Sequence, residues 1–245
     1  MRLAIISSPR AGNSWLREVL ALAYDLEMRA VHDPSELGPA LPARAVVQLH
    51  WDRTPEFVRY LQEQGVRVMS MARHPLDTLV SMLHFARFEP QVAHWLGGDY
   101  LAAVVGASPT SEAFERFALG PGAGRLLAVT PQWWSAPGTL QVRYETMRAD
   151  PGATLQALAD QLGEVPTLPL ASALAARPLE LFKSTPNRHA WRAEPGLWRR
   201  VVTPELAGRI RRAHPVPFAV LGYLCDPDPT LTPERAEAAW NELKA

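Results

Sequence analysis

Short apolar runs recur along the chain and constrain its fold more than any other feature of the sequence. Each run is five or six residues long and is largely apolar rather than strictly alternating. This pattern is typical of strands that are covered on both faces of a parallel sheet. The sequence therefore predicts four buried strands, at residues 2–6, 45–49, 66–71 and 139–144.

Segments with helical periodicity follow these runs, often with a proline near the first turn. Proline is tolerated there because the first amides of a helix have no partner within it. The alternation of strand and helix predicts a three-layer α/β fold, with a central parallel β-sheet flanked by helices. Ligands of such sheets bind at the carboxyl ends of the strands. The prolines are Pro55, Pro75, Pro151, Pro204 and Pro233.

Composition narrows the class of protein. The 245 residues are 47% hydrophobic, and Lys plus Arg equals Asp plus Glu at 25 each. This predicts one domain over residues 1–245, with no net charge to attract nucleic acid or an anionic membrane. Cys225 is the single cysteine, and no apolar stretch reaches membrane-spanning length, so an internal disulfide framework and a transmembrane segment are excluded. We expect a cytoplasmic protein that does not bind nucleic acid.

The loop after the first run, SSPRAGNSW, is similar to a phosphate-binding loop that lacks its lysine. In the Walker pattern G-x-x-x-x-G-K-[ST], Ser7 and Gly12 fall on the glycine positions. Asn13 falls on the lysine and Ser14 on the hydroxyl residue, so hydrolysis of a nucleoside triphosphate is not expected. Such a P-loop still directs backbone N–H groups at an anion without a metal. A serine-rich turn that merely caps a helix explains the loop equally well.

A second segment, after the third run, favours anion binding. It contains Arg73, Pro75, Asp77 and Ser81, and the proline and aspartate predict a firm helix start. Together the two segments resemble the signatures of sulfotransferases that use 3'-phosphoadenosine 5'-phosphosulfate (PAPS). The R-x-P-x-D-x-x-x-S signature is met in full. The P-K-S-G-T-T-W signature is similar to the run of Pro9, Arg10, Ala11, Gly12, Asn13, Ser14 and Trp15.

Two later segments extend this resemblance over most of the chain. The segment VRYETM at residues 142–147 is similar to the family's V-R-Y-E-D-L, which implies that Tyr144 lies near the adenine. The segment GLWRRVVT at residues 196–203 is similar to the late G-x-W-[KR]-x-x-x-T segment.

The family's R-K-G, just upstream of that late segment, falls on a different triplet here, WRA. The resemblance implies that Arg192 contacts the 3'-phosphate, with Arg188 as an alternative. Residues 166–200, which carry several prolines and no clear strand, are expected to form a lid or active-site loop.

The resemblance also implies roles for residues at the site. Asn13 and Ser14 would hold the 5'-phosphosulfate, Arg73 and Ser81 would hold the 3'-phosphate, and Trp15 would stack on the adenine. Trp15 also starts the apolar face of the following helix, so it is a core residue as well. No metal is implied.

Two residues are implied to carry the chemistry. Arg10 stands where the family has a lysine, and it would stabilise charge on the leaving phosphate without giving up its proton. His50 ends the second apolar run, and an imidazole there resembles the family's catalytic base. The family often has a lysine two residues earlier, where this chain has Gln48.

The acceptor is expected to bind between the nucleotide motifs, where aromatic side chains suit sugar rings or flat hydrophobic alcohols. The sequence thus indicates a sulfotransferase acting on a hydroxyl group of a small molecule, lipid or carbohydrate. Two alternatives stay open, a P-loop small-molecule kinase and a non-catalytic protein that binds PAPS or 3'-phosphoadenosine 5'-phosphate (PAP). The candidate acceptor residues are His84, Phe85, Trp95, Trp133 and Trp134.

Overall fold

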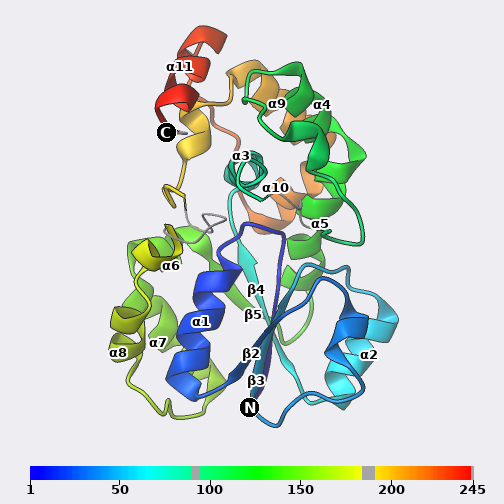
Figure 1. Cartoon of the computed structure of the whole chain (residues 1–245), viewed down its shortest axis with the longest axis vertical. Helices are drawn as coiled ribbons and strands as arrows, with labels where there is room; N and C mark the ends of the chain where they lie inside the picture. The colour runs from blue at the N-terminus through cyan, green and yellow to red at the C-terminus, as the bar shows by residue number, and fades with distance from the viewer. Residues whose placement is uncertain (90–93, 184–190, 244–245) are drawn as a thin grey trace.

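A central parallel sheet organises the computed structural model, which describes residues 1–89, 94–183 and 191–243 (Figure 1). The sheet has five strands in the order β2-β3-β1-β4-β5. Each neighbouring pair of strands is parallel, so the predicted α/β fold is confirmed. The strands are β1 (Arg2–Ile6), β2 (Glu27–Ala30), β3 (Ala45–Leu49), β4 (Arg67–Ala72) and β5 (Leu140–Arg143).

Helices cover both faces of this sheet and form a further layer beyond its carboxyl edge (Figure 1). The α-helices are α1 (Asn13–Tyr24), α2 (Pro55–Glu63), α3 (Pro75–Phe85), α4 (Glu112–Leu119), α5 (Pro121–Trp134), α6 (Tyr144–Ala149), α7 (Pro151–Leu162), α8 (Leu170–Ala176), α9 (Pro204–Ala213), α10 (Pro215–Leu221) and α11 (Pro233–Leu243). The 3-10 helices are η1 (Pro34–Leu37), η2 (Ala102–Val104), η3 (Leu179–Lys183) and η4 (Leu197–Arg200).

The sheet separates two hydrophobic cores. Successive side chains of a strand point to opposite faces, and β1 follows this rule. Leu3 and Ile5 pack into a core built with α1 and α7, whereas Ala4 and Ile6 pack into a larger core built with α2, α3 and α5. Burial on both faces explains why the strand sequence is almost continuously apolar.

Proline marks the start of helices as the sequence predicts. Helices α2, α3, α7, α9 and α11 all begin at the predicted prolines. The residue before the proline caps the helix in several cases, because its side chain accepts a bond from an amide of the first turn. Thr54 accepts from the amide of Phe57, and Thr203 accepts from the amide of Leu206.

Two parts of the chain differ from the sequence prediction. Strand β2 was not predicted, because its sequence, EMRA, is short, polar and mostly exposed; its pairing with β3 makes it the edge strand. Within residues 166–200, expected to be a lid or loop, α8 is helical instead. Ala173 of α8 is buried in the core that α1 helps to form, so this part of the segment belongs to the body of the fold.

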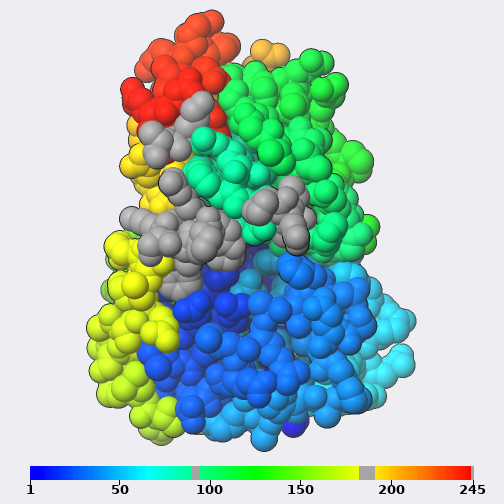
Figure 2. Space-filling model, in the orientation of Figure 1, coloured from blue at the N-terminus to red at the C-terminus, as the bar shows by residue number. Residues whose placement is uncertain are grey.

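The chain forms a lower half around the sheet and an upper half of helices. Figure 2 shows the blue segments, which bear β1 to β3, and the yellow ones, which contain α7 and α8, below the green, orange and red ones that contain α4, α9 and α11. Across the described ranges, helices are too short or too polar to cross a bilayer.

Candidate active site

A cleft of about 540 Å³ opens where β1, β3 and β4 end. Parallel strands place their carboxyl ends at one edge, so the loops after these strands meet there. The cleft brings together most of the predicted site residues. Its lining includes Arg10, Gly12, Asn13, Ser14, Trp15, His50, Arg73, Ser81 and Tyr144.

The loop between β1 and α1 is held in place by its own serines. The amide of Met71 in β4 donates to Ser7 Oγ at 2.7 Å, and the amide of Ser8 donates to Thr130 Oγ1 at 2.7 Å. Ser7 and Ser8 are buried. These side chains therefore fasten the loop to the sheet and to α5, at the edge of the cleft that Arg10, Gly12, Asn13 and Ser14 line.

Gly12 allows the loop to pass close to its neighbours. Its φ of 106° lies in the region that side chains rarely adopt, and a Cβ atom there would lie 2.8 Å from Tyr144 Cδ2 and 2.9 Å from Met71 Sδ. Only glycine satisfies both constraints. Pro9 and Ala11 are buried beside it and support the loop without lining the cleft.

Arg10 turns its guanidinium along the cleft. Its Nε donates to Ser81 Oγ at 3.3 Å, and the guanidinium lies 4.5 Å from the centre of the Phe85 ring. Burial, and then the nearby charge of Arg73, lower the pKa of Arg10 to about 9. The side chain still carries its positive charge at neutral pH.

Arg73 joins the segment after β4 to the loop after β1. Its Nη1 donates to the carbonyl of Arg10 at 3.0 Å, and its guanidinium lies 4.3 Å from the centre of the Tyr144 ring. Its Nε is buried without a hydrogen-bond partner among the described residues. An unpartnered N–H of a cation in a cleft is a donor well suited to an anion.

His50 lies directly after β3, facing the end of β1. Its Nδ1 is 2.7 Å from the carbonyl oxygen of Ser7. A carbonyl can only accept, so Nδ1 carries the proton and Nε2 holds the lone pair. The pKa of His50 is lowered to about 4, mainly by burial; the hydrogen bond to the Ser7 carbonyl opposes this shift, and the nearby charges of His32 and Arg10 add to it. His50 is therefore neutral at pH 7.

Two buried amide side chains lie beside His50. Gln48 is 9% exposed and Asn13 is 3% exposed. Gln48 Oε1 and Asn13 Oδ1 have no hydrogen-bond partner in the described part of the chain. Both residues line the cleft, so they offer unused polar atoms to a ligand there.

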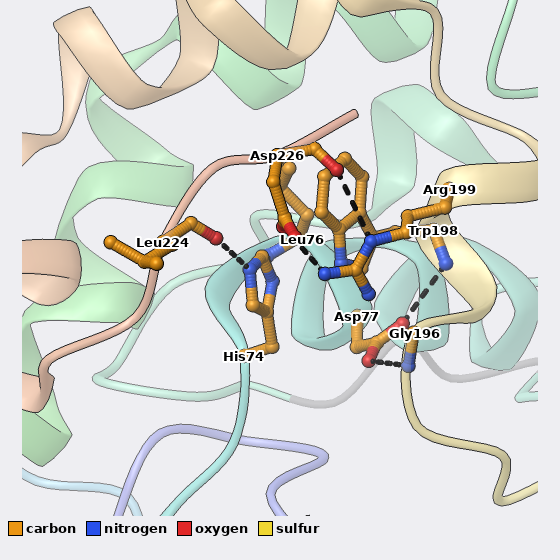
Figure 3. Close-up of polar contacts among 8 residues, drawn as sticks. All are labelled: His74, Leu76, Asp77, Gly196, Trp198, Arg199, Leu224 and Asp226. Atoms are coloured by element: carbon orange, nitrogen blue, oxygen red, sulfur yellow. Dashed lines mark hydrogen bonds and ion pairs between the residues drawn. The ribbon is translucent and has the colours of Figure 1, made fainter. Parts of the chain in front are cut away.

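Helix α3 holds the late segment of the chain against the cleft (Figure 3). The amides of Gly196 and Trp198 donate to the two carboxylate oxygens of Asp77 at 2.7 and 3.0 Å. The Trp198 ring stacks on His74 with centroids 4.9 Å apart. His74 is itself fixed by a bond of 2.9 Å between its Nε2 and the carbonyl of Leu224.

This attachment places the residues around the R-K-G position. Trp191 and Ala193 line the cleft, and Tyr144 Oη donates to the carbonyl of Ala193 at 2.9 Å. Arg192 is exposed and is not among the lining residues, so the structure does not bring it to the cleft. Arg188 lies outside the described residues.

The aromatic residues predicted for the acceptor divide into two groups. Phe85 and Trp95 line the cleft. Trp133 and Trp134 are buried in hydrophobic clusters instead, because α5 packs against the sheet. His84 is fully buried and stacks on Trp191 with centroids 4.0 Å apart.

Some lining residues were not predicted. Arg17, His32, Glu89 and Trp191 contribute to the cleft. Arg17 follows Asn13 by four residues, and positions four apart share a helix face. That spacing was the one sequence signal available for it.

Three comparisons with known proteins bear on this geometry. No protein-family model matches the chain, and no curated protein matches it. Among solved structures, mouse sulfotransferase SULT7A1 complexed with PAP is 19% identical, with a TM-score of 0.64, over 91% of this chain and 89% of that one.

Two structures of retinol dehydratase are also similar. One is in complex with androsterone and inactive cofactor PAP, and the other with retinol and PAP. Each is 16% identical to this chain and has a TM-score of 0.57. The matched region covers 89% of this chain and 81% or 82% of the retinol dehydratase chains. Identities this low establish architecture rather than activity. The chain therefore has the sulfotransferase fold.

Proposed function

We propose that this protein transfers a sulfuryl group from PAPS to a hydroxyl group of a small-molecule, lipid or carbohydrate acceptor. The observation that carries the proposal is the meeting of three groups in one cleft: the loop that contains Arg10, the pair Arg73 and Ser81, and His50. The sulfotransferase fold supports the same assignment. Each group stands at the end of a different strand of the sheet.

The residues present fit a bisphosphorylated nucleotide. The absence of a Cβ at Gly12 lets backbone amides at the start of α1 approach a phosphate. Arg73 Nε is a buried donor that lacks a partner in the described residues, and Ser81 lines the same cleft. We assign the 5'-phosphosulfate to residues 10–14, the 3'-phosphate to Arg73 and Ser81, and the adenine to the region of Trp15 and Tyr144.

His50 and Arg10 have different roles in the proposed reaction. PAPS supplies the sulfuryl group on a phosphate leaving group. As the acceptor oxygen forms its bond to sulfur and the bond from sulfur to the phosphate oxygen breaks, His50 Nε2 takes the hydroxyl proton. Arg10 stabilises the charge that develops on the departing phosphate. The acceptor leaves as a sulfate ester, and PAP is the second product.

The acceptor class follows from the remaining surface of the cleft. Trp95 lies 5.7 Å from His50 between ring centroids, and Phe85 and Trp191 line the same cleft. Aromatic side chains suit rings of sugars or of flat alcohols. The similar solved structures hold androsterone or retinol, which supports a small molecule as acceptor.

Calorimetric titration with PAP, beside ATP with Mg²⁺, tests the proposal. Wild-type protein and Arg73→Ala are compared, with Arg209→Ala as a matched control. Arg209 forms an ion pair with Glu115 on α4 and takes no part in the cleft. We expect PAP to bind the wild type and the control far more tightly than ATP, and Arg73→Ala to lose this binding.

Each other outcome contradicts a definite part of the proposal. A preference for ATP with Mg²⁺ would favour a P-loop kinase, and an absence of PAP binding would refute the nucleotide site. If PAP binds, incubation with PAPS distinguishes an enzyme from a binding protein, because only an enzyme hydrolyses PAPS or transfers its sulfuryl group. Release of PAP that persists unchanged in His50→Ala would refute the role of His50.

A further inference from the structure

Arg17 places a cation in the cleft for which the proposed function has no use. Its side chain is 15% exposed, and its contact with a carboxylate is a distant one, 3.8 Å from Nη2 to Glu18 Oε1. Its Nε is buried with no hydrogen-bond partner in the described ranges of the chain. Burial lowers the pKa of Arg17, yet a guanidinium stays charged at neutral pH. A buried charge of this kind calls for a negative partner.

The position of Arg17 on α1 separates it from Trp15, which we assign to the adenine side of the cleft. Trp15 Nε1 donates to the carbonyl of Arg177 at 2.8 Å, just beyond the end of α8. Arg17 is two residues later, about 200° further round the helix. It shares instead the face of Asn13, whose Nδ2 lies 3.5 Å from His50 Nδ1. Side chains of a helix lean toward its N-terminus, so Arg17 leans toward the turn that contains Asn13.

The end of β2 forms the wall of the cleft on this side. Ala30 is paired with Gln48 in the sheet register, and the amide of Val31 donates to the Gln48 carbonyl at 3.0 Å. His32 follows two residues later, and its charge is near enough to act on His50. Ala30, Val31 and His32 line the cleft together with Arg17, on the edge of the sheet away from β4 and Arg73.

Carboxylates of the cleft do not neutralise Arg17. Asp77 already accepts the amides of Gly196 and Trp198. Neither Asp77 nor Glu89, the other carboxylate in the described lining, has a hydrogen bond or ion pair with Arg17. Apart from the distant contact with Glu18, Arg17 therefore keeps an unmatched positive charge in the wall of the cleft that His50 also lines.

We propose that Arg17 binds an acidic group, a carboxylate or a sulfonate-type oxyanion, on the acceptor itself. The proposal rests on the proposed function and adds the substrate class, an anionic hydroxyl compound. A guanidinium presents paired N–H donors that match such a group. Arg17 thus orients the acceptor hydroxyl toward His50.

Benzoate and benzamide test this assignment as a matched pair of nearly equal shape, one charged and one neutral. Each is titrated into protein saturated with PAP, so that the nucleotide's anion sites are filled; benzenesulfonate, run in parallel, distinguishes a carboxylate from a sulfonate. The proteins are wild type, Arg17→Gln, Arg17→Lys and the surface control Arg209→Gln. We expect the wild type and Arg209→Gln to bind one of the two anions at least tenfold more tightly than benzamide. Arg17→Gln should lose that preference with its benzamide and PAP affinities unchanged, and Arg17→Lys should retain part of it.

Several results would overturn the proposal. One is wild-type protein that binds benzamide as tightly as the anions, and another is wild-type protein that binds none of the three probes. A preference for the anions that persists in Arg17→Gln would also contradict the role of Arg17. A loss of PAP affinity in Arg17→Gln would make Arg17 a nucleotide ligand instead. If Arg17→Gln does not fold, the Nε–H resonance of wild-type Arg17, assigned by its absence in Arg17→Lys, must shift on adding the anions and not on adding benzamide.

Failure of the proposed function would be recognised separately. Wild-type protein that does not bind PAP refutes the nucleotide site. The probes are then titrated into the protein without PAP. A preference for the anions that depends on Arg17 would still identify an anion subsite at this residue.

Discussion

His50 has the protonation state that a base needs before the reaction begins. A positioned base contributes about 10²- to 10⁴-fold to a rate, so His50→Ala is expected to lower kcat by that order with the Kd for PAP unchanged. Steady-state kinetics and calorimetry on the same protein measure both. A change in PAP affinity as large as the change in kcat would show that His50 acts on the nucleotide instead.

The pH dependence of turnover follows from the same side chain. The pKa of His50 is about 4, mainly because of burial, so the neutral, proton-accepting form prevails above that pH. We expect kcat to stay level as pH falls from 8 to about 5, and to drop as pH passes through the pKa near 4. A profile that already declines near pH 6.5 would mean that the imidazole is not held neutral as described.

Gly12 offers a test of the loop geometry at the level of one methyl group. Gly12→Ala introduces a Cβ against Tyr144 and Met71 at a positive φ, so we expect a loss of about 1–3 kcal/mol in unfolding free energy and weaker PAP binding. Gly163→Ala is the matched control, since Gly163 has a φ of 64° but open space around its Cβ position. The free energy of unfolding in urea is measured for both variants. Gly163→Ala carries only the cost of the positive φ, whereas Gly12→Ala also carries the steric clash with Tyr144 and Met71. Equal losses of stability in the two variants would show that this clash does not occur.

Residue by residue, the sequence predicted the contributors to the cleft best where spacing and strand ends coincide. Arg73 and Ser81 are eight positions apart on one strand end and one helix, and both line the cleft. The prediction for Arg192 depended only on its place in the triplet WRA, which differs from the family's R-K-G. The direction of its side chain is not encoded in that triplet, and Arg192 is exposed in the structure. Arg17 was not predicted to line the cleft, because an arginine on an amphipathic helix is usually exposed to solvent.

At the scale of elements, Asp77 links α3 to the late segment of the chain. Asp77→Asn keeps one acceptor oxygen but cannot accept from both amides, so one bond to a charged acceptor is lost, about 1.5–3 kcal/mol. We expect faster hydrogen exchange at Gly196 and Trp198, and PAP affinity lowered about tenfold, which corresponds to about 1.4 kcal/mol.

Asp226→Asn is the control for that variant. Asp226 pairs with Arg199 in the same region, but its side chain is 60% exposed, and exposed pairs contribute about 0–1 kcal/mol. Exchange and PAP affinity should therefore stay close to wild type. If Asp77→Asn behaves like Asp226→Asn, the late segment does not depend on α3 for its position.

Elements with strong local signals were predicted, and those fixed by tertiary contacts were not. Helices α2, α3, α7, α9 and α11 begin at the expected prolines, because proline restricts the backbone locally. Strand β2 and helix α8 owe their structure to neighbours, β3 for the one and α1 with α7 for the other. Trp133 and Trp134 look like pocket residues in the sequence, yet α5 packs them into hydrophobic clusters.

For the whole molecule, ligand binding and unfolding are linked. A ligand at 100 times its Kd stabilises the folded state by about 2.7 kcal/mol, which for a chain of this size raises Tm by roughly 5 to 10 °C. We expect PAP to produce this shift in the wild type and not in Arg73→Ala, measured by differential scanning fluorimetry. A shift of equal size in both proteins would contradict the assigned 3'-phosphate site.

Strand β1 has a consequence for the order in which the molecule is built. It supplies Leu3 and Ile5 to one core and Ala4 and Ile6 to the other, but its sheet partners are β3 and β4 rather than the nearby β2. Another 66 residues must be made after Ile6 before β4 is complete. At about 5–20 residues per second, the ribosome takes roughly 3 to 13 s over them. The nascent chain therefore carries this apolar strand without its sheet partners for seconds, which is time enough for a chaperone to bind it.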